Sequence, residues 1–125
     1  MKKYISGLFL ILLASVSSTV LAGQAEIIDV RVSNNQDSFR FDVTLKHDDT
    51  GWDHYADGWE VISPAGDVLG KRVLAHPHVN EQPFTRSLSG VRIPQGVSTV
   101  SIRAHDSIHG YNEKMFVVDL SGSQN

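Results

Sequence analysis

The sequence predicts an all-β protein, a seven-stranded β-sandwich that follows a cleaved signal peptide. Apolar and polar residues alternate with a period of two through several short segments, which is the pattern of strands with one buried face. Turn-forming residues separate these segments at short intervals. No segment after the signal shows a sustained 3.6-residue period, so helices are expected to be short or absent.

The first 22 residues have the three-part form of a secretory signal peptide. Two lysines give a positive start, residues 8–16 form an apolar run, and Val20-Leu21-Ala22 supplies residues that a signal peptidase accepts. The apolar run is too short and too close to the start for a convincing membrane-spanning helix. We therefore expect residues 1–22 to be removed, and residues 23–125 to form one domain that is periplasmic or secreted.

Composition narrows the expected partners. The sequence has no cysteine, so lipid attachment after Ala22 lacks an acceptor thiol, and the fold must stand without disulfides in an oxidising compartment. We therefore expect a free soluble protein with no membrane insertion after cleavage. The formal charge of the full chain is −3, and loss of the two signal lysines makes that of the mature chain about −5. A negative charge argues against nucleic acid and anionic membrane surfaces as partners.

The expected strands, in order along the chain, are residues 28–32, 39–45, 59–61, 68–74, 84–88, 100–104 and 116–120. Their inward-facing side chains are expected to be Ile28, Val30, Val32, Phe39, Phe41, Val43, Leu45, Trp59, Phe84, Val100, Ile102, Ala104, Phe116, Val118 and Leu120. Residues 34–37, 63–66 and 94–96 have turn chemistry. Seven short strands favour an immunoglobulin-like (fibronectin III-like) sandwich, with a barrel as the alternative.

Histidines are expected to gather at one end of this sandwich. Strands that run alternately up and down place the loops after the second, fourth and sixth strands at the same end. These loops, residues 47–58, 75–83 and 105–111, hold all six histidines, whereas the loops of the other end hold none. The histidines are His47, His54, His76, His78, His105 and His109. The topology thus predicts one imidazole-rich end, which is also rich in acidic and aromatic residues.

The segment His76-Pro77-His78 is the sharpest local element of that end. Pro77 favours an extended conformation at His76, and residues two apart in an extended segment point the same way. Both imidazoles could then bind one divalent transition metal, and the lack of cysteine favours Zn or Cu(II) over Cu(I). The expected ligands are His76 and His78, joined by some of His54, His105 and His109. The alternative is that these histidines make loop hydrogen bonds and bind no metal.

Aromatic residues at the same end suggest a second function, a protein or glycan interaction module. The expected contact residues are Trp52, Tyr55, Tyr111 and Glu81. The aromatic side chains could instead fold back over the core. A pH-responsive surface is a third possibility, because histidines beside carboxylates titrate near neutrality. Residues 105–107 contain the residue types of a hydrolase triad, but no nucleophile elbow or oxyanion hole is suggested, so we expect no enzymatic activity.

Three segments together resemble a family of small uncharacterised bacterial exported proteins. They are residues 51–57, residues 76–87 with the pattern HPHxxEQPFTRS, and residues 109–111. The resemblance covers most of the mature chain, and its middle motif is fairly specific. It implies no activity, cofactor or catalytic residue.

Overall fold

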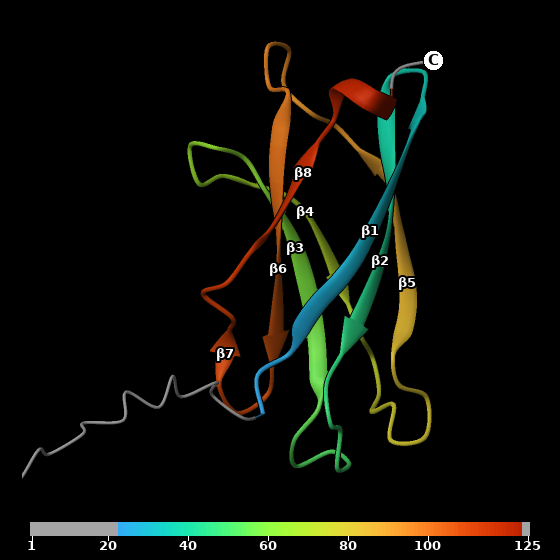
Figure 1. Ribbon diagram of the computed structural model, residues 1–125, viewed down its shortest axis with the longest axis vertical. Coiled ribbons are helices and arrows are strands. Elements are labelled where there is room, and N and C mark those ends of the chain that lie inside the picture. Colours follow the sequence, from blue (N-terminus) through green and yellow to red (C-terminus); the bar gives the residue numbers. More distant parts are fainter. Residues whose placement is uncertain (1–22, 124–125) are drawn as a thin grey trace, which may run out of the picture.

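The computed structural model describes residues 23–123 as two antiparallel β-sheets (Figure 1). The predicted signal peptide lies outside the described residues. One sheet has the order β1-β2-β5, with β1 at Glu26–Asn35, β2 at Ser38–Lys46 and β5 at Phe84–Val91. The other has the order β4-β3-β6-β7, with β4 at Val68–Val73, β3 at Ala56–Ile62, β6 at Thr99–Asp106 and β7 at Gly110–Tyr111. Strand β8, Phe116–Asp119, also pairs with β6, and a 3₁₀ turn, η1, covers Ser121–Ser123.

The prediction of an all-β protein is confirmed at the level of a two-sheet sandwich. Residues 23–123 contain no α-helix, and this part of the chain has no helix long and apolar enough to cross a membrane. The sequence predicts seven strands, whereas residues 23–123 form eight, because two short strands pair with β6 in succession. Asn112 N still donates to Ala104 O of β6 at 2.9 Å, and the Asn112 side-chain oxygen then accepts from Lys114 N at 2.9 Å in the turn between the two strands.

The core lies between the two sheets and follows the predicted alternation closely. Phe41, Val43 and Leu45 of β2 are fully buried, as are Trp59 of β3 and Ile102 of β6. These large side chains come from both sheets, so their burial holds the sheets together through the hydrophobic effect.

One inward-facing assignment on the first strand is wrong. Ile28 is 41% exposed, and its neighbour Ile27 is buried instead. The register of β1 against β2 shifts between Ile27 and Asp29, and such a bulge places two consecutive residues opposite one partner. The alternation therefore changes phase here, which periodicity alone does not reveal.

The loops after β2, β4 and β6 lie at the same end of the sandwich, at the bottom of Figure 1. We call this end the histidine pole: residues 47–55, 74–83 and 107–109, with the strand ends beside them. Hydrogen bonds join its loops, since His78 N donates to Asp49 Oδ2 at 2.7 Å and Tyr55 N donates to Ser107 Oγ at 3.1 Å. The predicted convergence of three distant loops is thus what the structure shows.

Candidate metal centre

His47 opens the site directly after β2. Its side chain has no exposed surface, and its Nδ1 lies 2.5 Å from Asp49 Oδ1. An ionised carboxylate can only accept a hydrogen bond, so Nδ1 carries the proton and donates it. In the neutral ring with this tautomer, Nε2 bears the lone pair that a metal ligand needs.

Asp49 orients His47 and also ties the surrounding loops together. Its side chain is fully buried. Oδ1 also accepts from Ala56 N at 2.9 Å, and Oδ2 accepts from His78 N at 2.7 Å. A buried carboxylate is tolerated when donors compensate its charge, and Asp49 has three donors from three places in the chain.

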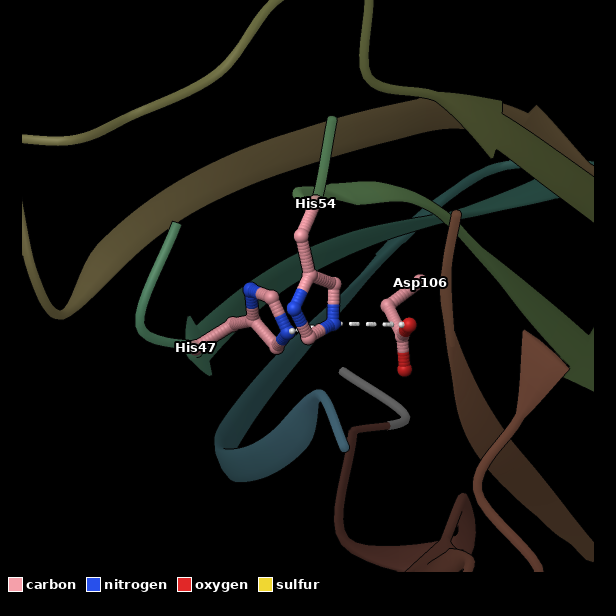
Figure 2. A group of neighbouring side chains, drawn as sticks. All are labelled: His47, His54 and Asp106. Atoms are coloured by element: carbon pink, nitrogen blue, oxygen red, sulfur yellow. Dashed lines mark hydrogen bonds and ion pairs between the residues drawn. The ribbon is translucent and has the colours of Figure 1, made fainter. Parts of the chain in front are cut away.

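Four potential ligand atoms meet at the inner side of these loops. His54 Nε2 lies 3.2 Å from His47 Nε2 and 3.1 Å from Asp106 Oδ1. The carbonyl oxygen of Gly23 lies 2.8 Å from His47 Nε2 and 3.1 Å from His54 Nε2. Figure 2 shows the rings of His47 and His54 side by side, with Asp106 facing His54.

The spacing of these atoms is that of ligands around one ion. One ligand atom each from His47, His54 and Asp106 lies within 4.8 Å of the others. Two nitrogens bound to one tetrahedral zinc ion, each about 2.0–2.1 Å from it, lie about 3.3 Å apart. The two imidazole nitrogens are 3.2 Å apart, so a small shift of either ring would let both bind one cation.

Asp106 ends β6 and starts the turn that follows. Its Oδ1 accepts from Ile108 N at 2.9 Å and from His109 N at 2.7 Å, a local pattern for which Asp is favoured in turns. Burial alone would raise the pKa of Asp106, but these backbone N–H groups and His109 outweigh it and hold the pKa below its ordinary value. Its Oδ2 is buried and has no hydrogen-bond partner among the described residues. Asp106 therefore has one oxygen, Oδ2, whose lone pairs are unused, while Oδ1 is the oxygen that faces His54.

The predicted ligands are only partly brought together. His54 is in the cluster and His109 borders it: the His109 ring centroid is 4.9 Å from that of His54, and its Nδ1 is 3.1 Å from Asp106 Oδ1. His105 lies apart, with Nδ1 hydrogen-bonded to Asp57 Oδ1 and its ring against Tyr111. The prediction that it joins the same site has no support from this placement.

His76 and His78, the favoured pair in the sequence, lie side by side without joining the cluster. Their ring centroids are 4.6 Å apart, yet His76 is exposed while His78 is buried and stacks on Phe84 at 4.0 Å. Nη2 of Arg86 lies 2.9 Å from His78 Nε2 and donates to it. Burial and then the charge of Arg86 lower the pKa of His78, so its ring is neutral and serves packing.

His47 is absent from the predicted ligand set, although the sequence contains a signal for it. The inward phase of β2 runs through Val43 and Leu45 at every second residue, and the same count reaches His47 and then Asp49. Both are buried. Continuing the alternation past the apolar residues would have indicated a buried imidazole and a buried carboxylate.

The predicted contact residues divide between two surfaces. Trp52 is 68% exposed and meets Tyr55 edge to face, with ring centroids 5.5 Å apart. Tyr55 and Tyr111 line a cleft of about 350 Å³ whose wall also includes Gly58 and the ring of His105. Glu81 lies elsewhere, paired with Arg86 at 3.2 Å.

The carboxylate of Glu60, in the wall of the cleft, is bonded to two neighbouring side chains. Glu60 accepts from Arg103 Nη2 and from Tyr111 OH, each at 2.6 Å, and the Arg103 guanidinium covers the Tyr111 ring at 3.9 Å. Burial would raise the pKa of Glu60, but the hydrogen bonds from Tyr111 and Arg103 outweigh it, and the pKa lies below its ordinary value. This carboxylate is a satisfied ion-pair partner.

Comparison with known proteins gives one relative and no established activity. The chain is 45% identical over 97 residues to a "putative lipoprotein" of Halomicrobium mukohataei. The match covers 77% of this chain and 47% of that protein, so the chain spans about half the length of the relative. No family model and no solved structure matches the chain. The similarity supports a family of proteins without an assigned function and does not test the HPH-containing motif.

Proposed function

We propose that this is an exported protein that binds one divalent transition metal, Zn(II) or Cu(II), at the histidine pole. The proposed ligands are His47, His54 and Asp106. The observation that carries the proposal is the approach of their ligand atoms to within 4.8 Å. The Asp49–His47 hydrogen bond adds the outer-shell carboxylate that typically orients a metal-binding histidine.

The arrangement of lone pairs favours a cation at this point. When Nδ1–H of His47 donates a hydrogen bond to Asp49, Nε2 of the neutral ring carries a lone pair. That lone pair faces the Gly23 carbonyl oxygen at 2.8 Å. Asp106 Oδ1 adds another acceptor beside His54. Acceptors that face one another repel unless a proton or a cation lies between them. A metal ion would satisfy all of them, and imidazolium formation is the competing arrangement.

A binding role is proposed in preference to catalysis. The Ser107 hydroxyl accepts a hydrogen bond from Tyr55 N at 3.1 Å, and His105 is paired with Asp57. Neither supplies the nucleophile held against its base that a hydrolase triad needs.

The metal proposal is tested with untagged protein and two matched variants. Wild-type protein should gain about 2.7 kcal/mol of stability at a free metal concentration of about 100 times the Kd. His54→Gln, whose side chain is 22% exposed, should lose this gain and still fold, whereas His76→Gln should keep it. A wild-type protein that gains no stability from Zn(II) or Cu(II) refutes the proposal. If only His76→Gln loses metal binding, the metal site lies at His76-Pro77-His78 instead.

Export and the immunoglobulin-like topology belong to the same proposal. The three-part N-terminus supports a periplasmic or secreted location, as does the similarity to a lipoprotein. The sheet orders β1-β2-β5 and β4-β3-β6-β7 support a fibronectin III-like arrangement, because the fourth strand pairs with the third and not with the fifth.

A second candidate function is recognition of a protein or glycan through the aromatic side chains. The exposure of Trp52, in edge-to-face contact with Tyr55, favours it, because exposed aromatic side chains commonly mark contact surfaces. Since Trp59 is buried, a partner at this surface should change the fluorescence of Trp52. Titration with defined oligosaccharides should change the signal of wild-type protein and leave that of Trp52→Ala unchanged. Equal fluorescence changes in wild-type protein and Trp52→Ala would show that Trp52 does not contact the oligosaccharide.

A further inference from the structure

We propose that signal-peptide removal creates a further ligand of this metal site, the free α-amino group of Gly23. The proposed cleavage after Ala22 makes Gly23 the first residue of the mature protein. This inference rests on the metal-binding function proposed above. It adds that the exported, processed protein is the form that binds the metal tightly.

Gly23 already lies where a ligand would lie. Its carbonyl oxygen is 2.8 Å from His47 Nε2 and 3.1 Å from His54 Nε2. The amino nitrogen and carbonyl oxygen of one residue are joined through two carbon atoms, so both can close a five-membered ring on one ion. Rotation of the terminal residue about its Cα–C bond would let the amine join the oxygen on an ion between the two imidazoles.

The approach of the imidazoles requires glycine at this position. A Cβ atom on residue 23 would lie 2.9 Å from Cε1 of His109 and 3.1 Å from Cε1 of His54. The φ angle of Gly23 is +99°, a conformation that residues with a side chain rarely adopt. The imidazole rings of His54 and His109 therefore lie against a residue without a side chain. Glycine is common where the main chain approaches a ligand closely.

The segment that carries Gly23 is anchored just beyond it. Ala25 is 1% exposed, and its carbonyl oxygen accepts a hydrogen bond from Asn112 Nδ2 at 3.0 Å. The new N-terminus would therefore begin two residues from a fixed point in the core. A ligand that is already positioned costs little ordering entropy when the ion binds.

Processing changes the chemistry of this nitrogen. In the precursor it is an amide whose lone pair is delocalised into the preceding carbonyl, which makes it a poor ligand. In the mature chain it is an amine with an ordinary pKa of about 7.7–8.0, and an ion binds it by displacing one proton. Five ligand atoms would then surround the ion: the Gly23 amine and carbonyl oxygen, two imidazole nitrogens and one oxygen of Asp106.

The test compares two N-termini of the exported protein. The full chain is expressed with export, and intact mass locates the start of the mature protein. A second chain carries one alanine inserted between Ala22 and Gly23, so that processing at the same signal leaves an amide at Gly23 and moves the amine about 3.8 Å along the chain. The Kd for Zn(II) and Cu(II) is measured for both proteins and for His54→Gln. An acylating reagent then measures whether the metal protects the terminal amine.

The inference predicts a mature N-terminus at Gly23, a Kd weaker by at least about 10-fold in the extended protein, and protection of the amine by the metal. It is overturned if processing occurs elsewhere. It is also overturned, while the metal site itself survives, if both N-termini give the same Kd and His54→Gln abolishes binding. If neither N-terminal form binds either metal, the proposed function fails and this inference fails with it.

Discussion

Asp49→Asn tests whether one buried carboxylate holds the histidine pole together. The substitution keeps the shape of the side chain, which has no exposed surface. Asp49 accepts from His47 Nδ1, Ala56 N and His78 N, whereas an amide has one acceptor oxygen and presents N–H groups on its other side. At least one buried donor must therefore lose its partner.

The size of the effect follows from that count. A hydrogen bond to a charged group contributes about 1.5–3 kcal/mol, and a buried donor left unsatisfied costs about 1–3 kcal/mol. Because these terms overlap, we expect Asp49→Asn to lower the free energy of unfolding by about 2–5 kcal/mol. Each kcal/mol corresponds to a fall in Tm of about 4–8 °C for a domain of 60–100 residues.

Urea unfolding of the metal-free protein measures this loss. The control is Asp48→Asn, the same chemical change on the neighbouring exposed residue, which should alter stability by less than about 0.5 kcal/mol. Equal stability of the two variants would falsify the assignment of Asp49 as the anchor of the pole. The Kd for metal should also weaken, by about 10- to 100-fold, because His47 loses its orienting partner. An unchanged Kd would show that the Asp49–His47 bond does not prepare a ligand.

Three further perturbations address other parts of the structure. Trp52→Ala should change the unfolding free energy by less than about 0.5 kcal/mol, because the indole is 68% exposed; a large loss in thermal unfolding would place it in the core. The lowered pKa of Glu60 means that its ion pair stabilises the fold above the ordinary carboxyl pKa and that this contribution disappears as the pH falls through the lowered value. Glu60→Gln should therefore flatten the loss of stability between pH 7 and pH 3, and a curve parallel to wild type would contradict the assignment. Arg86→Met should raise the pKa of His78 toward its ordinary value, as followed by NMR, because the neighbouring positive charge is removed.

The strands and the core were largely predictable because a strand with one buried face has apolar residues at every second position. Phe41, Val43 and Leu45 alternate cleanly and are fully buried. Alternation fails where the ladder changes register, as at Ile28, because a bulge is set by pairing with a second strand and leaves no local mark. The small strand β7 was missed for a related reason, since two residues are too few to show a period.

The end of the molecule that carries the candidate metal centre was predictable from topology. Of the three residues that form it, only His54 was predicted. Antiparallel order fixes which loops share an end, and that needs only the strand count. Ligand choice depends on how each loop folds back. The spacing of His76 and His78 is the more typical of metal ligands. However, His78 N donates a hydrogen bond to Asp49 and the Arg86 guanidinium donates to the His78 ring, and these bonds hold His78 in the interior. The approach of Gly23 to the imidazoles also depends on a segment distant in sequence.

The two buried carboxylates of the histidine pole, Asp49 and Asp106, differ in how many of their oxygens are hydrogen-bonded. Both oxygens of Asp49 are hydrogen-bonded, so its charge is fully used in joining the loops. Asp106 has Oδ1 in several bonds and Oδ2 without a partner among residues 23–123. An unsatisfied buried polar group costs about 1–3 kcal/mol. The oxygen of Asp106 that faces His54 is Oδ1, so a cation at the imidazoles would remove this cost only if the carboxylate turned Oδ2 toward it. Asp106 thus keeps an oxygen that could accept a further bond, whereas Asp49 does not, and this is the difference on which the proposed metal site depends.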